Sequence, residues 1–131
     1  MSITENKELV LGFFGDIGKG NIQGALDRMA EDLRFTLIGT SRFSGVFKSR
    51  KEFVDRILVP LGAQLDGPLT FTTDNLIAEG DFVVAQSHGH STTRKGVAYD
   101  NTYCHVFRIA GGKIRAVTEY LDTELINRAL G

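Results

Sequence analysis

Residues 97–122 read VAYDNTYCHVFRIAGGKIRAVTEYLD, and this stretch decides the fold. It is rich in β-branched and aromatic residues, which favour strands, and Gly111-Gly112 divides it near the middle. Two adjacent glycines between such runs are typical of a two-residue hairpin turn. The stretch therefore predicts two antiparallel strands, Val97 to Ile109 and Lys113 to Asp122.

The same pattern continues toward the N-terminus. Glu79-Gly80-Asp81 and Lys95-Gly96 are further turn signals, and they bound two more strands, Leu69 to Ala78 and Phe82 to Thr93. Consecutive strands joined by short turns pair in an antiparallel meander. The second half of the chain is therefore predicted to form a four-stranded sheet.

The first half of the chain has helical periodicity instead. Apolar residues from Leu9 to Ile17 recur at three- and four-residue spacing, and Thr4 is a candidate N-cap for this helix. Asn21 can cap a short second helix whose apolar side extends to Met29. Phe35 to Ile38 then has the composition of a strand.

A third helix is predicted after a loop that runs from Gly39 to Lys48. Ser49 and Glu52 have the spacing of a capping box, which marks the start of a helix. Pro60 predicts a kink or an early end near Val59, because proline has no backbone N–H to donate.

A final short helix, Glu124 to Leu130, follows Thr123, which can begin it. Helices that precede a meander in chain order are typical of an α+β fold. The chain has 131 residues, which is an ordinary size for one domain, so residues 1–131 are predicted to form a single domain.

Composition excludes several classes of function. Lys and Arg total 15 against 16 Asp and Glu, and no basic cluster is long enough to follow a phosphate backbone, so nucleic acid is not an expected partner. The single cysteine, Cys104, has no partner for an internal disulfide. No apolar run approaches the roughly 20 residues needed to span a bilayer, and the first residues lack a secretory or transit pattern. We expect a cytoplasmic protein without a membrane segment.

The two turns set a register for the last three strands. A two-residue turn at Gly111-Gly112 pairs Tyr103 with Tyr120, and one at Lys95-Gly96 pairs His88 with Tyr103. Paired residues lie on the same face of a sheet. This register brings eight polar residues to one face: Gln86, His88, His90, Asn101, Tyr103, His105, Tyr120 and Asp122.

That face is predicted to form the floor of a cavity. Its other end is apolar and includes Phe107, against which Phe14 and Ile17 of the first helix would close. A slip of one residue in either hairpin would invert a strand and bring Glu119 inward in place of Asp122.

The opposite face carries an apolar strip that a monomer would leave in water. The strip consists of Val83, Ala85, Val106, Val117 and Leu121. We therefore expect a homodimer that packs through this outer face.

Three parts of the sequence resemble one family: the stretch from Tyr99 to Ile114 followed by Glu119-Tyr-Leu-Asp122, the loop from Gly39 to Ser49, and the amphipathic first helix. They resemble the SnoaL-like, ketosteroid-isomerase-related members of the nuclear transport factor 2-like superfamily. The resemblance implies a cone-shaped fold, in which a strongly curved antiparallel sheet and three helices enclose a pocket, often in a homodimer. Members of the family include isomerases, polyketide cyclases, epoxide hydrolases, dehydratases and proteins without catalytic activity.

One departure from that family limits where a general base can lie. Ketosteroid isomerases carry a general-base Asp in the strand before the loop glycine, where this sequence has Thr36-Leu37-Ile38-Gly39. The acidic residue that cyclases and epoxide hydrolases place on a late strand looks matched by Asp122 or Glu119. Asn101 occupies a position that is often polar in the family.

Asp122 is the leading candidate for a general base. A carboxylate beside apolar walls has its charged form disfavoured, which raises its affinity for a proton. The alternative is structural, because Asp122 directly precedes the final helix and can cap it.

The other polar residues offer supporting roles. Tyr103 and Asn101 are donors that can stabilise a developing negative charge on oxygen, or they can simply satisfy buried neighbours. His88 and the other histidines suit proton transfer near neutral pH. His88 and His90 share a face, where His105 can join them, and such a group could hold a divalent metal if a third ligand is present. The family resemblance implies no metal, so none is expected.

The sequence thus predicts a cofactor-free acid/base enzyme that acts on a small, apolar, oxygen-containing compound. The alternative is a binding or accessory protein that uses the same pocket without turnover. The predicted catalytic residues are Asp122, Tyr103, Asn101 and His88. The predicted substrate-binding residues are Phe14, Ile17, Gln86, His90, His105, Phe107 and Tyr120.

Overall fold

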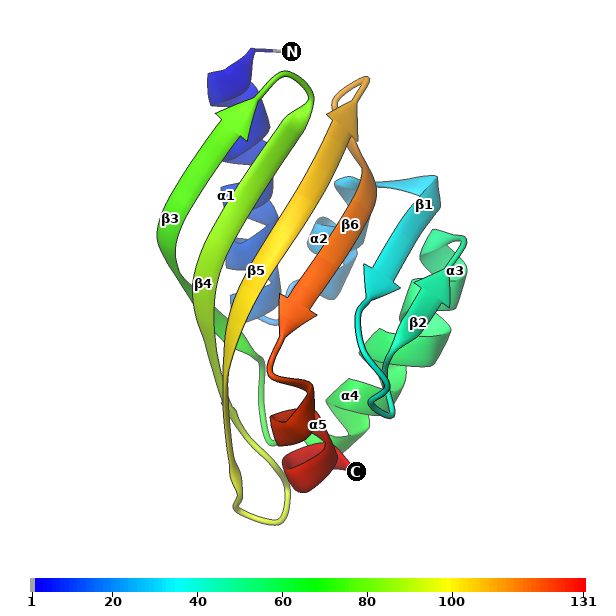
Figure 1. Cartoon of the computed structure of the whole chain (residues 1–131), viewed down its shortest axis with the longest axis vertical. Helices are drawn as coiled ribbons and strands as arrows, with labels where there is room; N and C mark the ends of the chain where they lie inside the picture. The colour runs from blue at the N-terminus through cyan, green and yellow to red at the C-terminus, as the bar shows by residue number, and fades with distance from the viewer. Residues whose placement is uncertain (1) are drawn as a thin grey trace.

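The computed structural model describes residues 2–131 as a curled six-stranded sheet with helices packed against one side (Figure 1). The strand order is β2-β1-β6-β5-β4-β3, so the sheet is not closed into a barrel. The elements are α1 (Ile3–Gly18), α2 (Ile22–Asp27), β1 (Met29–Leu37), β2 (Gly45–Phe47), α3 (Arg50–Phe53), a π-helical turn (Val54–Leu58), α4 (Val59–Gln64), β3 (Thr70–Glu79), β4 (Phe82–Thr92), β5 (Ala98–Ala110), β6 (Lys113–Leu121) and α5 (Thr123–Leu130). The predicted α+β class with its four-stranded meander is confirmed.

Two strands differ from the sequence prediction. Met29 begins β1 instead of ending α2, because Arg28 already caps the helix and Met29 lies beside Ile114 of β6. This β1–β6 pairing is parallel, in an otherwise antiparallel sheet. The predicted loop after Gly39 contains the short strand β2, which pairs with the end of β1.

Capping side chains set the starts of the helices. Ser2, and not Thr4, caps α1: the Oγ of Ser2 accepts from the backbone N–H of Glu5, and the Glu5 side chain accepts from the backbone N–H of Ser2. Asn21 caps α2 as predicted, and Ser49 caps α3. Each side chain satisfies a backbone donor that has no partner inside its helix.

The third helix does not end near Pro60. A π-helical turn lets the N–H of Val59 reach the carbonyl of Val54, so that Pro60 falls in the first turn of α4. A proline is tolerated there because its missing N–H would have no intrahelical acceptor. The helix therefore continues to Gln64 and extends one wall of the fold.

The β4–β5 hairpin has a three-residue turn, and this shifts the predicted register by one. The N–H of Gly96 donates to the carbonyl of Thr93, and the N–H of Thr93 donates to the carbonyl of Val97. Gly96 has a φ of +82°, which suits the last position of such a loop. As a result Tyr103 lies opposite Ser87, and not opposite His88.

The β5–β6 hairpin has the predicted turn but contains a bulge just after it. Gly111 and Gly112 both have positive φ, and Ile109 pairs with Ile114 as expected. Arg108 then pairs with Ala116, which leaves Arg115 without an opposite residue. Beyond this bulge His105 lies opposite Glu119, and Tyr103 lies opposite Leu121.

These two shifts exchange the faces of β4 and of most of β6. Val83, Ala85 and Val117 are buried on the inner face, and Leu121 lines the cavity, so the prediction that these four residues form an outer apolar strip is wrong. The large exposed hydrophobic residues on the outer side of β3, β4 and β6 are Ile77, Phe82 and Tyr120. Homodimerisation through the outer face stays a prediction.

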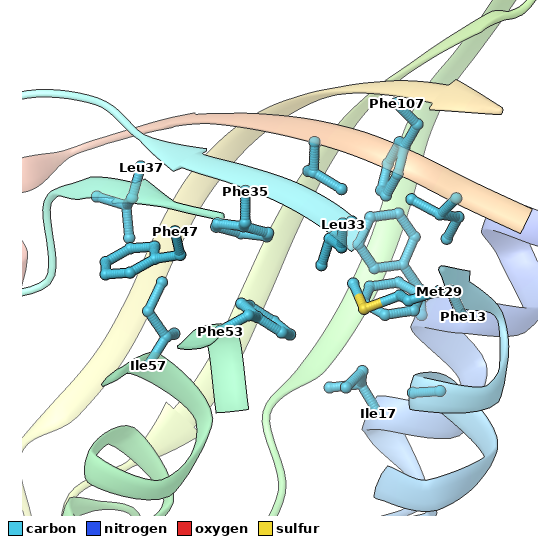
Figure 2. Packing of buried hydrophobic residues seen from close by; sticks show 14 of the residues in the cluster. Phe13, Ile17, Met29, Leu33, Phe35, Leu37, Phe47, Phe53, Ile57 and Phe107 are labelled. Atoms are coloured by element: carbon cyan, nitrogen blue, oxygen red, sulfur yellow. The ribbon is translucent and has the colours of Figure 1, made fainter. Parts of the chain in front are cut away.

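The core lies between the inner face of the sheet and the helices. Phe35 and Leu37 of β1 point toward the third helix, where the rings of Phe35 and Phe53 stack with centroids 4.4 Å apart (Figure 2). On the α1 side, Phe13 packs edge-to-face against Phe107. The two clusters are the walls between which a cavity can open.

Gly89 on β4 makes room for the ring of Tyr103. A Cβ at position 89 would lie 2.6 Å from Cε2 of Tyr103. We expect Gly89→Ala to lower the free energy of unfolding by about 1–3 kcal/mol, because the ring and the strand must separate. Urea denaturation measures this change.

Gly15→Ala in α1 is the matched control, since nothing lies within 4 Å of a Cβ at that position. It should raise stability by roughly 0.5–1 kcal/mol, because alanine favours a helix over glycine. Unchanged stability of Gly89→Ala would mean that the Tyr103 ring moves aside at no cost.

Candidate active site

A cavity of about 270 Å³ opens between the sheet and the helices. Its walls come from α1, from the helix that runs through α3 and α4, from α5, and from the inner faces of β1, β3, β5 and β6. Nearly all of the lining side chains are aliphatic or aromatic. The side chains with polar atoms among them are Tyr99, Tyr103, His105 and Glu119.

Glu119 and His105 form a buried pair at the cavity wall. Nε2 of His105 lies 2.8 Å from Oε1 of Glu119, and the two side chains are 5% and 13% exposed. They meet because the β5–β6 register places them directly opposite each other on the inner face. Nδ1 of His105 is buried and has no hydrogen-bond partner within residues 2–131. A buried nitrogen without a partner is uncommon in folded proteins.

Aromatic rings hold the His105 imidazole in place. It stacks against Tyr103 on one side and Phe107 on the other, with ring centroids 5.3 and 5.7 Å away. Phe14 of α1 contacts it edge-on at 5.3 Å. These contacts and the bond to Glu119 fix the ring orientation.

Two tyrosines and one amide form a second polar group. The hydroxyl of Tyr103 donates to the hydroxyl of Tyr99 over 3.2 Å, and Nδ2 of Asn101 donates to the same oxygen over 3.2 Å. All three residues alternate on the inner face of β5. Burial raises the pKa of Tyr99 and raises the pKa of Tyr103 well above its usual range. Both phenols therefore stay protonated at neutral pH and act as donors.

The structure brings five of the predicted residues to the cavity or its edge. Phe14, Ile17, Tyr103 and His105 line it. Asn101 is buried beside it and contacts Tyr99. The prediction that the first helix closes the cavity is confirmed. Phe107 is not part of the lining, because it lies behind the rings of Phe13 and Phe14.

Four predicted residues lie on the opposite face of the sheet. His88 and His90 are 63% and 69% exposed and pair with Asp74 and Asp100 of the neighbouring strands. Gln86 bonds to Asn75 on the same outer face. Tyr120, 46% exposed, is also outside. Their predicted placement in the cavity is wrong, because the three-residue turn inverts β4 and the bulge inverts β6.

Asp122 does not face the cavity either. Its Oδ1 accepts from the backbone N–H groups of Glu124 and Leu125, which is the geometry of an N-cap on α5. Asp122 therefore has the helix-capping role that the sequence analysis gave as the alternative to a general base. Glu119 is the carboxylate of the cavity, as the one-residue slip predicts.

Two site residues were missed or ranked second, and the sequence contains a signal for each. Tyr99 is an even number of residues away from Tyr103 and His105 on the same strand, so its side chain had to point to the same face. In the sequence, the apolar β-branched residues Ile114 and Val117 are three apart, a spacing that would place them on opposite faces of an unbroken strand. That spacing indicates the bulge and, with it, the inward position of Glu119.

No group of three or more His, Cys, Asp or Glu side chains within residues 2–131 is arranged to hold a metal ion. Among the helices of the same residues, none has the length and apolar character needed to cross a membrane.

Comparison with known proteins agrees with this fold. A nuclear transport factor 2-like protein from Burkholderia thailandensis, 24% identical, superposes with a TM-score of 0.84 over 100% of this chain and 99% of its own. TerC, which was co-crystallised with polyporic acid, is 18% identical and superposes with a TM-score of 0.81 over 95% and 97% of the two chains. An uncharacterized protein of Mycobacterium tuberculosis is 25% identical over 92% of this chain and 91% of its own length. The fold is therefore that of nuclear transport factor 2-like proteins.

The model of the SnoaL-like domain matches residues 10–117 of this chain. The chain therefore belongs to the SnoaL-like family.

The capping role of Asp122 can be tested through stability. We expect Asp122→Ala to lower the free energy of unfolding by about 1 kcal/mol, because two backbone donors of α5 lose their acceptor. Asp122→Asn should stay close to the wild type, since asparagine caps helices as well as aspartate does. Urea denaturation of both variants measures the difference, and an equal loss in both would contradict a capping role.

The buried tyrosines predict a loss of stability at alkaline pH. The unfolded chain releases phenolic protons near pH 10, whereas burial raises the pKa of Tyr99 and Tyr103 in the folded state. The free energy of unfolding should therefore fall as the pH rises beyond about 10. Tyr103→Phe should show a shallower decline in urea titrations at several alkaline pH values. A decline as steep as that of the wild type would exclude Tyr103 as a source of the effect.

Proposed function

We propose that this protein is a cofactor-free acid/base enzyme that acts on a small, largely apolar compound containing a carbonyl, hydroxyl or epoxide oxygen. The observation that carries the proposal is the Glu119–His105 pair, buried in an apolar cavity with one imidazole nitrogen unpartnered. Isomerisation, cyclisation, dehydration and epoxide opening all require a positioned base and a donor to oxygen.

His105 is the proton acceptor in this proposal. When Nε2 carries the ring proton and donates it to Glu119, Nδ1 has a free lone pair. Nδ1 can then take a proton from a carbon or hydroxyl of the substrate and return it in a later step. Glu119 holds the tautomer and stabilises the imidazolium that forms, as a carboxylate does for a catalytic histidine.

Tyr99 is the donor to the substrate oxygen. Loss of a proton beside a carbonyl places negative charge on the oxygen, and a hydroxyl in a dry cavity stabilises that charge strongly. Tyr103 and Asn101 hold the Tyr99 hydroxyl in place. The apolar walls exclude water and contact the rest of the substrate.

A non-catalytic binding protein is the second candidate, and the largely apolar lining favours it. A protein of the same fold, TerC, was co-crystallised with a small organic molecule. Binding without turnover would need the cavity but not the proton-transfer pair, so the two candidates differ in what Glu119 does.

Turnover measured on a panel of ketones, epoxides and polyketide-like compounds separates the candidates. We expect Glu119→Gln to lower kcat by roughly 100-fold or more, because a glutamine cannot stabilise the imidazolium. Cys104→Ser on the outer face is the matched control and should keep full activity, as should Asp122→Asn. Circular dichroism establishes that Glu119→Gln is folded.

Two outcomes would count against the enzyme. Unchanged turnover in Glu119→Gln would remove the base assignment. Tight binding of panel compounds without turnover of any of them would favour the binding protein.

A further inference from the structure

The side-chain amide of Asn101 has all four of its hydrogen-bonding positions occupied. Oδ1 accepts from the backbone N–H of Thr102 at 2.8 Å and from that of Asp122 at 3.1 Å. Nδ2 donates to the carbonyl of Asp122 at 3.1 Å and to the hydroxyl of Tyr99 at 3.2 Å. The residue is 1% exposed, so water does not replace these partners.

This set of partners fixes which way the amide points. Two backbone N–H groups face Oδ1 and a backbone carbonyl faces Nδ2, so the opposite orientation would oppose donor to donor and acceptor to acceptor. The group directed at Tyr99 is therefore an N–H. The Tyr99 oxygen must accept from it.

The Tyr99 oxygen accepts a second hydrogen bond from the hydroxyl of Tyr103. A phenolic oxygen has one proton and two acceptor positions, and both acceptor positions are now used. The Tyr99 proton has no acceptor among the hydrogen bonds of residues 2–131. Because Tyr99 lines the cavity, a ligand is the partner that can receive this proton.

We propose that Asn101 is a positioning residue which forces Tyr99 to donate into the cavity, so that the natural ligand carries a hydrogen-bond acceptor, such as a carbonyl oxygen, at that point. The inference rests on the proposed function only in taking the cavity as a small-molecule site. It requires neither turnover nor a role for Glu119.

A matched pair of probes tests this selectivity. 2-Acetylnaphthalene and 2-isopropylnaphthalene have nearly the same shape, but only the ketone offers an acceptor. We expect the wild type to bind the ketone about tenfold more tightly by isothermal titration, which is the size of one buried hydrogen bond. The infrared carbonyl stretch of the bound ketone should move to lower frequency, as it does when a carbonyl accepts a hydrogen bond.

Three variants assign this effect to residues. Tyr99→Phe should lose both the preference and the infrared shift while it binds the hydrocarbon as the wild type does. Asn101→Asp has the same shape but no N–H, so its carboxylate accepts from Tyr99 and turns the phenolic proton away from the cavity. It should lose the preference although Tyr99 is still present. Cys104→Ser, on the outer face of the sheet, is the control and should keep both the preference and the infrared shift.

The infrared shift separates positioning from a general loss of structure, because it reports only the hydrogen bond to the bound carbonyl. Asn101→Asp with the wild-type preference and shift would overturn the role of Asn101. If Asn101→Asp does not fold, Tyr99→Phe decides: a wild-type preference and infrared shift in Tyr99→Phe would overturn Tyr99 as the donor.

The wild type alone distinguishes this inference from the proposed function. Equal binding of the two probes would overturn the acceptor requirement and leave the small-molecule cavity intact. If neither probe binds to the wild type or to a second preparation that carries Cys104→Ser, both the acceptor requirement and the small-molecule cavity would be overturned.

Discussion

A single bulged residue, Arg115, decides which side chains of β6 face the interior. Without it, Ile114 and Val117 could not both be buried, because side chains three apart on a regular strand point to opposite faces. Burial of each is worth about 1.5–3 kcal/mol, enough to favour the irregular ladder. The Arg115 side chain bonds to the carbonyl of Ala110 and reaches Asp32, which holds the bulge. Glu119 is opposite His105 as a consequence.

The lining of the cavity is divided into aromatic walls and a strip of polar groups. Phe35 and Phe53 hold the third helix to β1, and α1 packs its rings on Phe107. Between them, the inner face of β5 presents Tyr99, Tyr103 and His105 at alternate positions. A low-dielectric wall strengthens each hydrogen bond made to a ligand, and it also makes an unpartnered group costly. The unpartnered Nδ1 of His105 and the Tyr99 hydroxyl are the groups for which the proposed ligand, largely apolar with one polar oxygen, would supply a partner.

The ends of β5 and β6 connect the site to the rest of the fold. The ladder ends at Leu121, and the Asn101 amide then binds both backbone groups of Asp122. Asp122 in turn caps α5, which brings Ile126 and Leu130 to the cavity wall. One buried amide therefore joins α5, which forms part of the cavity wall, to the hydroxyl of Tyr99.

The sequence by itself determined the α+β class, the main helices and the antiparallel order of the four-stranded meander, because these follow from local periodicity and turn residues. The short strand β2 and the parallel pairing of β1 with β6 were not predicted, since they depend on contacts between distant segments. The sequence also placed Phe14, Ile17, Tyr103 and His105 at the cavity. Which face β4 and β6 turn inward was decided by the tertiary structure. Side-chain direction reverses with every residue, so a third residue in the Gly96 turn and the bulge at Arg115 were enough to exchange His88 and Asp122 for Ser87 and Glu119.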